Sequence, residues 1–419
     1  MSWKTRLATV AIITLAIFAE LAPSLKINPI NLANPPHSKA AAMTPPNNPS
    51  NVDARLVAAN TKFGFNLFNS LTKQQPNQNI FISPTSVALA LSMAYNGVSG
   101  ETKQEMTKVL ELTGMTPQEV NEGNQALQNS LQKVDPNVQV SIANSLWAKQ
   151  GFSLKPEFLQ INQHYYNAHL TELDFMNPQA PSIINNWVSQ KTQRKIDKIV
   201  DRISSDQVLF LINAIYFKGN WQTPFDKSKT ANKTFSLTDG SSKQHPMMSQ
   251  TGIYGYYATD KFQAVSLRYG KEGALAMYIF LPKSNSNLAT FLEQLTPENW
   301  KIWMQQFSEE KKGSIEIPRF KIDYKVELSN TLIPLGMAGI FDSFQSDFSP
   351  MTDDKIAVDS VQHKTFVEVN EEGTEAAAVT SIGTRSSPFQ MKVNRPFFCA
   401  IQDDTTGTIL FMGTIVDPQ

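Results

Sequence analysis

Cysteine is almost absent from this 419-residue chain, in which Cys399 is the only one. A single thiol cannot form an intramolecular disulfide, so packing must stabilise the fold even if the protein is exported. Its neighbours Phe398 and Ile401 are apolar. They predict a thiol buried in a strand rather than a catalytic or metal-binding group.

A net charge is also lacking, because 37 basic residues balance 37 acidic ones. The first 51 residues contain four of the basic residues and one of the acidic residues, which leaves 33 and 36 in the body, a net charge of −3. This mildly acidic body gives no reason to expect nucleic acid as a partner.

The groups that hydrolases and metal sites require are sparse as well. The chain has five histidines and no Gly-x-Ser-x-Gly nucleophile elbow. His164 and His169 are the one close pair of histidines, and they are more consistent with positions that flank a helix end than with metal ligands. We therefore expect no enzyme activity, no metal and no cofactor.

The N-terminus does contain an apolar run, Leu7–Ala19, which follows Lys4 and Arg6. This order is typical of a secretory signal peptide. The run is shorter than the ~20 residues of a comfortable membrane span. We therefore expect a secreted or extracellular protein, with periplasmic retention or membrane anchoring by an uncleaved segment as the alternative.

The signal cleavage site stays open. Ala40–Ala42 offers a late site of small residues, and an earlier cut near Ala19 or Ala22 is equally consistent with the sequence. Residues Asn34–Ser50 are rich in Pro, Asn and Ser and predict a disordered tether. The sequence thus divides into a signal peptide or hydrophobic segment (1–42), a disordered linker (43–51) and a single domain (52–419).

Helical patterns mark the first part of this domain. Ser83 followed by Pro84 predicts the capped start of one helix, and Thr116–Glu119 is a capping box that starts another. An earlier amphipathic helix is indicated by apolar residues at helical spacing, namely Leu56, Ala59, Phe63, Leu67 and Leu71.

Strand patterns dominate the second part. Val138, Val140 and Ile142 alternate as in a strand, and the apolar run Val208–Phe217 predicts a central strand covered on both faces. Further strands are predicted at Ala264–Tyr269, Ala274–Leu281, Ser314–Ile322, Thr365–Asn370 and Met391–Gln402. Early helices and late strands, without an internal repeat, indicate one α+β domain.

Five short blocks carry a specific resemblance. They are Asn79–Ser86 (NIFISPTS), Asn213–Trp221 (NAIYFKGNW), Glu371–Thr380 (EEGTEAAAVT), Val393–Ile401 (VNRPFFCAI) and Leu410–Pro418 (LFMGTIVDP). In this order and at these separations they resemble the serpin family. The resemblance spans roughly Val52 to Pro418 and implies helices packed around a large mixed β-sheet plus two smaller sheets, with an exposed reactive-centre loop.

The resemblance also implies a mechanism, suicide inhibition of a serine protease by a monomer. The protease attacks the loop and forms an acyl-enzyme. The cut loop then inserts into the large sheet as a new strand and carries the protease with it. About 12–14 residues at roughly 3.3 Å each give a displacement of about 40–46 Å, and the new hydrogen bonds release on the order of 10 kcal/mol.

The hinge of the loop can be checked against this mechanism. The resemblance assigns it to Glu371, Gly373, Thr374, Glu375, Ala376, Ala377 and Ala378. Thr374, Ala376 and Ala378 share one strand face, with Glu375 on the other, and Gly373 gives the turn a permissive backbone. No charge would enter the sheet interior, which favours an inhibitor over a non-inhibitory serpin with a binding, chaperone or storage role, the alternative function.

Two further sets of residues are implied by the resemblance. Residues under the strands that must part form the shutter, which matches Ser83, Ser86, Asn213 and His363. Residues where the loop first enters form the breach, which matches Trp221, Glu371 and Arg319. If the Glu371–Arg319 pair were exposed, it would be worth no more than about 1 kcal/mol.

The reactive bond has two candidate positions. Counting back from Pro396 gives Arg385–Ser386, and counting forward from Gly373 gives Ser387–Pro388, where the proline makes a poor substrate. We prefer Arg385–Ser386, because an arginine before the bond suits trypsin-like enzymes. The alternative, Ser386–Ser387, suits elastase-like or subtilisin-like enzymes.

Heparin is not expected as a partner. In some serpins a basic helix binds this polyanion. Here the helix that starts at Thr116 carries Glu119, Glu122 and, near its end, only Lys133.

Overall fold

The computed structural model describes residues 52–308, 310–372 and 388–419. Its helices are α1 (Ala54–Gln74), α2 (Pro84–Tyr95), α3 (Gly100–Val109), α4 (Pro117–Gln132), α5 (Pro156–Tyr166), α6 (Ala180–Lys191), α7 (Leu288–Glu293), α8 (Pro297–Met304) and α9 (Ser329–Leu332), with short 3₁₀ helices η1 (Lys227–Lys229), η2 (Gln305–Ser308) and η3 (Gly339–Phe341). Its strands are β1 (Ile80–Ile82), β2 (Val138–Lys149), β3 (His169–Leu173), β4 (Leu209–Gly219), β5 (Ala231–Ser236), β6 (Ser242–Ala258), β7 (Phe262–Tyr269), β8 (Leu275–Pro282), β9 (Glu310–Pro318), β10 (Phe320–Glu327), β11 (Ser360–Val369), β12 (Phe389–Lys392), β13 (Phe397–Asp403) and β14 (Thr408–Ile415). The predicted α+β class is confirmed.

Five strands form a mixed sheet in the order β10-β11-β4-β2-β3. Strands β11 and β4 are parallel neighbours, whereas β10 pairs antiparallel with β11 and β2 pairs antiparallel with β4. Strand β4 corresponds to the predicted apolar run, and it is buried from Leu209 to Phe217. A strand buried on both faces has no polar face to expose, which explains its continuous apolar sequence.

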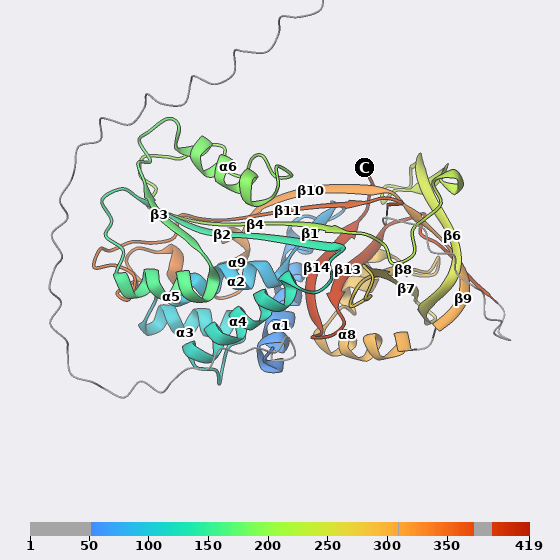
Figure 1. Ribbon diagram of the computed structural model, residues 1–419, viewed down its shortest axis with the longest axis horizontal. Helices are drawn as coiled ribbons and strands as arrows, with labels where there is room; N and C mark the ends of the chain where they lie inside the picture. The colour runs from blue at the N-terminus through green and yellow to red at the C-terminus, as the bar shows by residue number, and fades with distance from the viewer. Residues whose placement is uncertain (1–51, 309, 373–387) are drawn as a thin grey trace, which may run out of the picture. The chain divides into compact units, whose positions relative to one another are not determined.

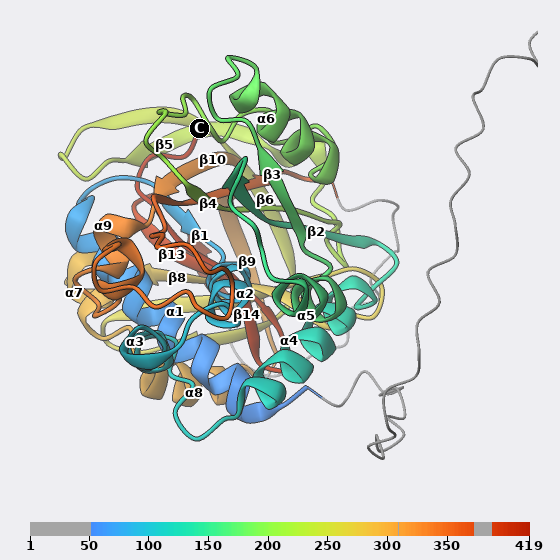
Figure 2. The same cartoon turned by 90° about the vertical axis from the view of Figure 1, so that its left-hand side faces the viewer.

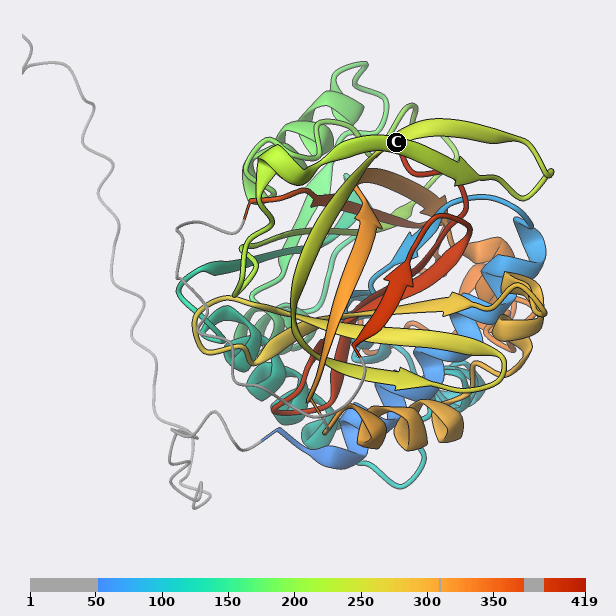
Figure 3. The same cartoon turned by 90° about the vertical axis from the view of Figure 1, so that its right-hand side faces the viewer.

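The other strands of the described part form one nine-stranded sheet, in the order β1-β14-β13-β8-β7-β6-β9-β12, with β5 paired to β6. Strand β6 has 17 residues. It pairs with β5 and β9 over most of its length and with β7 through Tyr256–Ala258. The two smaller sheets implied by the resemblance are therefore joined, because one long strand belongs to both. This sheet faces the viewer in Figure 3.

Helices cover both faces of the five-stranded sheet. Figures 1 and 2 show α6 on one face, and α2, α4 and α5 on the other. The face under α6 carries its own hydrophobic cluster, which includes Trp147, Phe210, Tyr216 and Phe366 from the strands and Ile184 from α6. The larger core cluster lies on the opposite side and joins this sheet to α1, α2 and the nine-stranded sheet.

The predicted helix starts are confirmed. Thr116 Oγ1 accepts from the Glu119 backbone N–H, and the Glu119 carboxylate accepts from the Thr116 N–H at 2.7 Å, which completes the capping box of α4. Ser83 is the N-cap of α2, and its hydroxyl accepts from the Ser86 N–H. Local capping chemistry alone suffices to locate these two ends.

Two strands predicted as continuous are each divided. The segment Ser314–Ile322 is split at Arg319 between β9 and β10, and Met391–Gln402 is split between β12 and β13. In both places a proline, Pro318 or Pro396, lacks the N–H that would continue the ladder. The chain changes its strand partners at both places.

No helix in the described residues is long and apolar enough for a membrane span. The predicted signal peptide and linker lie outside these residues, so export stays a prediction.

Candidate functional site

The boundary between β4 and β11, which we call the seam, lies at the centre of the five-stranded sheet. Its parallel register runs from Ser360 opposite Phe210 to Val367 opposite Phe217. The chain leaves the end of β11 through Asn370, Glu371 and Glu372. The predicted hinge therefore begins directly beside the seam.

A buried polar group crosses the seam on the face toward α2. His363 on β11 lies opposite Asn213 on β4, and His363 Nδ1 lies 2.5 Å from Asn213 Oδ1. His363 Nε2 accepts from the Ser83 backbone N–H at 3.1 Å. Asn213 Nδ2 in turn donates to Ser86 Oγ and to the Ser86 carbonyl. The structure thus brings together the four residues assigned to the shutter.

These contacts determine the protonation state of His363. Because Nε2 accepts from an N–H, the proton of the neutral ring must be on Nδ1, where it is donated to Asn213 Oδ1. Burial lowers the pKa of His363 to about 3, because a charged ring would lose its hydration there. The imidazole is therefore neutral at physiological pH.

Sequence reasoning missed Asn144 on β2. It lies opposite Asn213 in the β2–β4 register, and its Oδ1 accepts from Asn213 Nδ2 at 2.5 Å. The row of buried polar groups thus extends over β2, β4 and β11. The signal in the sequence was weak, because Asn144 is followed by the polar Ser145, and only the strand register gives Asn144 a partner.

The seam is also crossed on the face toward α6. The rings of Tyr216 and Phe366 lie opposite each other in register, with centroids 5.8 Å apart. Because side chains alternate along a strand, Tyr216 points away from the face that carries Asn213. The two sides of the seam are therefore linked by a polar contact below the sheet and an aromatic contact above it.

The connection from α6 to β4, residues 192–208, spans this second face. Lys364 on β11 is 10% exposed, and its Nζ donates to the Lys198 carbonyl at 3.0 Å. Lys325 on β10 pairs with Asp201 at 2.6 Å, and Asp201 also pairs with Lys198. The connection is thus tied to the two strands on the far side of the seam from α6.

Trp221 closes the end of the seam at the breach. Its indole Nε1 donates to the Asn370 carbonyl at 2.8 Å, which links the chain after β4 to the chain after β11. The ring stacks on Tyr269, with centroids 4.3 Å apart and planes at 14°. Trp221 is 4% exposed, so this link is shielded from water.

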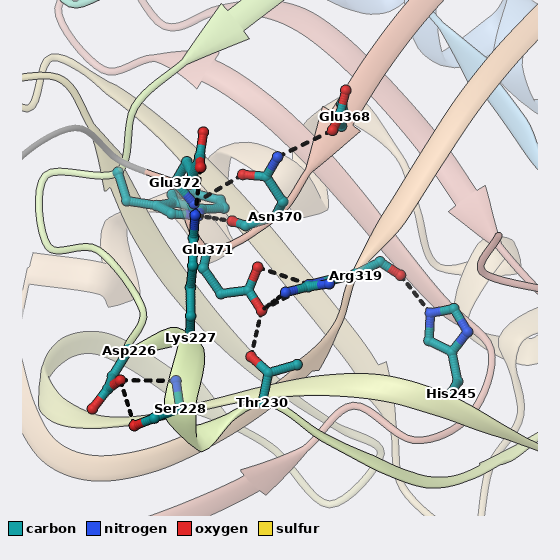
Figure 4. Close-up of polar contacts among 11 residues, drawn as sticks. Asp226, Lys227, Ser228, Thr230, His245, Arg319, Glu368, Asn370, Glu371 and Glu372 are labelled. Atoms are coloured by element: carbon teal, nitrogen blue, oxygen red, sulfur yellow. Dashed lines mark hydrogen bonds and ion pairs between the residues drawn. The ribbon is translucent and has the colours of Figure 1, made fainter.

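Glu371 and Arg319 form the charged pair of the breach (Figure 4). Arg319 Nε lies 2.7 Å from both carboxylate oxygens of Glu371, and Thr230 Oγ1 donates to the same carboxylate. Burial raises the pKa of Glu371, but the bonds from Arg319 and Thr230 outweigh it, so that the pKa lies below its usual value. Thr230 is a second residue that the sequence did not reveal.

Only one residue of this ion pair is exposed to solvent. Glu371 is 2% exposed and the Arg319 side chain is 42% exposed. The limit of about 1 kcal/mol that holds for exposed pairs therefore does not apply here. If Arg319 were removed, an almost buried carboxylate would keep only Thr230 as a side-chain partner, at a larger cost.

The next residues connect the breach to the loop. Glu372 pairs with Lys227 Nζ at 2.5 Å, and its backbone N–H donates to Asn370 Oδ1. The hinge positions 373–378 and the candidate reactive bonds at 385–387 lie outside the described residues. The chain is described again at Pro388, after which β12 pairs in parallel with β9 of the nine-stranded sheet.

Cys399 lies in β13 and is fully buried. Burial raises the pKa of its thiol far above the usual value, which makes a thiolate nucleophile unfavourable. In the part of the chain that the structure describes, no group of three or more His, Cys, Asp or Glu is arranged to hold a metal.

Comparison with known proteins identifies the family. A family model described as serpin (serine protease inhibitor) matches residues 58–418. The chain belongs to the serpin family. This serpin is 35% identical over 381 residues to the human leukocyte elastase inhibitor, in an alignment that covers 87% of this chain and 100% of that protein.

Solved structures agree with this assignment. Glycosylated human kallistatin has a TM-score of 0.81 at 27% identity, covering 88% of this serpin and 99% of that chain. Human thyroxine-binding globulin, in complex with thyroxine, has a TM-score of 0.79 at 28% identity, covering 87% and 99%. The predicted serpin fold is therefore confirmed, while the roles of individual site residues stay predictions.

Proposed function

We propose that this serpin inhibits serine proteases as a suicide substrate, by inserting its cleaved loop into the seam. The observation that carries the proposal is the direct parallel pairing of β4 and β11, with the chain leaving β11 beside that seam. A chain that turned back at Gly373 would run antiparallel to both strands. Two antiparallel ladders would replace one parallel ladder, which is a net gain in hydrogen bonds.

The contacts across the seam supply the barrier. A new strand would move β4 and β11 from about 4.8 Å to roughly 9.6 Å apart. The direct contacts His363–Asn213, Phe366–Tyr216 and Trp221–Asn370 could not persist at that separation. The barrier thus consists of the parallel β4–β11 ladder and a few side-chain contacts, which must break before the cleaved loop can insert.

We propose Arg385–Ser386 as the reactive bond and a trypsin-like enzyme as the target. An arginine side chain complements the acidic primary pocket of such enzymes. Ser386–Ser387, with an elastase-like or subtilisin-like target, is the alternative. In either role the serpin is consumed as an inhibitor and is not a catalyst.

The direct test mixes the serpin with trypsin, elastase and subtilisin and separates the products on a denaturing gel. We expect an SDS-resistant band at the summed mass with trypsin, because the acyl-enzyme ester is covalent. Mass spectrometry of the released C-terminal peptide identifies the reactive bond. We expect this peptide to begin at Ser386. Complete cleavage with full residual protease activity would contradict inhibition.

Two charge substitutions in the hinge separate insertion from cleavage. Thr374→Arg would place an unpaired charge inside the sheet, so we expect cleavage without a stable complex. Glu375→Arg is the matched control, because this side chain would face water after insertion. Equal inhibition by the two variants would exclude this path of insertion.

A non-inhibitory role is the rival function. One structural neighbour, thyroxine-binding globulin, binds a small ligand, as its name and its complex with thyroxine state. The same gel discriminates the two. A non-inhibitory serpin would give clipped chain and active protease with each of the three enzymes.

A further inference from the structure

A groove lies away from the seam, between the nine-stranded sheet and the end of α1. It has a volume of ≈ 500 Å³, within the range of small-molecule sites. It is lined by the loop after α1, the turn after β5, the start of α7 and the chain before β13. None of the shutter or breach residues contributes to it.

Aliphatic residues and prolines make up half of the uncharged lining residues, and Ser, Thr, Asn and Gln make up the other half. Ile80, Pro282 and Val416 are buried in its wall, and Leu237, Leu288 and Leu292 are half-buried beside them. No aromatic ring from residues 52–308, 310–372 or 388–419 lines the groove, so these residues offer no surface on which a flat aromatic ligand would stack. These walls match a flexible alkyl chain better than a ring system.

Among the described residues, Arg395 is the one charged residue that lines this groove, and none of those that line it is acidic. Its Nε and Nη2 donate to the Pro282 carbonyl at 3.0 and 2.6 Å, and Nη1 donates to Asn394 Oδ1 at 3.2 Å. A guanidinium has five N–H groups. The hydrogen bonds within the described residues engage three of them, and both acceptor atoms are uncharged.

The guanidinium is also partly removed from water. Arg395 is half-buried, and burial lowers the pKa of its side chain, although the group stays charged at physiological pH. Among the described residues no carboxylate forms an ion pair with it. An uncompensated cation beside an aliphatic wall is complementary to a ligand with an anionic head and an apolar tail.

We propose that this groove binds alkyl carboxylates, with the carboxylate on Arg395 and the alkyl chain along Leu237, Leu288 and Leu292. The planar fork of arginine matches a carboxylate geometrically. The site is independent of the proposed inhibition, since it shares no residue with the seam.

Isothermal titration calorimetry with decanoate on the full chain tests the proposal. We expect saturable binding with one site per chain. Decanol has the same tail without the charge, and we expect it to bind at least 10-fold more weakly. Equal affinity for decanoate and decanol, or no saturable binding of decanoate, would overturn the assignment.

Variants locate the site. Arg395→Gln keeps a hydrogen-bonding side chain but removes the charge, and we expect at least a 10-fold loss of decanoate affinity. Lys392→Gln removes a charge from the same segment but does not line the groove, so we expect no change. Ala289→Trp, at an exposed helical position of the lining, should fill the groove and abolish binding.

A separate control for folding is needed, because Arg395 also donates hydrogen bonds to the Pro282 carbonyl and its loss could destabilise the fold. Arg395→Lys keeps the charge, and we expect it to retain decanoate binding within about 5-fold. If Ala289→Trp melts like the parent chain yet binds decanoate normally, the ligand lies elsewhere and the proposal fails.

Discussion

His363 couples the seam to pH at the scale of a single residue. Its ring is neutral in the fold, with a pKa of about 3, whereas an unfolded histidine has a pKa near 6.5. The unfolded chain therefore binds the extra proton between these values. Stability is fully present above about pH 6.5 and falls as the pH drops toward 3.

We expect the free energy of unfolding to fall by about 1.4 kcal/mol per pH unit below pH 6 on account of this group. Urea unfolding between pH 7.5 and 4.5 measures it. His363→Asn should remove this slope, and His164→Asn, at an exposed position, should keep it. The same slope in His363→Asn as in the parent chain would show that the ring is not the titrating group.

Arg319 and Glu371 are unequal partners, because the carboxylate is nearly buried and the guanidinium is not. Arg319→Gln should therefore lower the free energy of unfolding by about 1–3 kcal/mol, more than Glu371→Gln does, since only the first leaves a buried charge. Thermal unfolding of both variants and of the double variant tests this. Strict additivity would show that the pair does not couple.

At the scale of elements, the connection from α6 to β4 restrains the seam. Lys325–Asp201 ties it to β10, on the far side of the seam. Both side chains are partly exposed, so the pair contributes at most about 1 kcal/mol. We expect Lys325→Met to speed loop insertion on heating by about 2–5-fold.

The measurement is the rate at which intact serpin loses inhibitory activity on incubation below its melting temperature. Lys62→Met is the matched control, because Lys62 on α1 forms an exposed pair with Glu111, away from the seam. Equal rates for the two variants would mean that the connection does not limit opening.

The ends of helices and strands show which features of the fold can be predicted from the sequence. Caps at Ser83 and Thr116 depend on side chains within three residues, so the sequence predicts both helix starts. The division at Arg319 depends on which strand each neighbour pairs with, and that information is not local. Apolar residues alternate on both sides of the break, at Ile315 and Ile317 and again at Phe320 and Ile322, and only a one-residue shift in phase distinguishes two strands from the single predicted one.

The residues of the candidate site divide in the same way, into those that the sequence predicts and those that only the fold brings together. Ser83, Ser86 and Asn213 lie in the family blocks and His363 lies ten residues before Gly373, so the resemblance could assign all four, and their contacts agree with one group. Asn144 and Thr230 lie outside those blocks, and each is placed by pairing across strands or by approach of a distant loop. Partners that are distant in sequence need the fold before they can be named.

At the scale of the whole molecule, cleavage of the loop should release stored free energy. Insertion of a strand worth on the order of 10 kcal/mol would raise the melting temperature by roughly 10–15 °C. Differential scanning calorimetry before and after cleavage measures this. Cleaved Thr374→Arg should melt close to the intact protein, and an unchanged melting point of the cleaved parent chain would mean that the intact fold is already relaxed.

The two flanks of the loop belong to different sheets, since β11 lies in the five-stranded sheet and β12 pairs with β9 in the other. Under the proposed mechanism one new terminus would travel the length of a sheet while the other stayed in place. The severed ends could not meet again, so religation would be ruled out. Each molecule would then act once. The molar quantity of serpin, rather than its affinity for the protease, would therefore determine how much protease is inhibited.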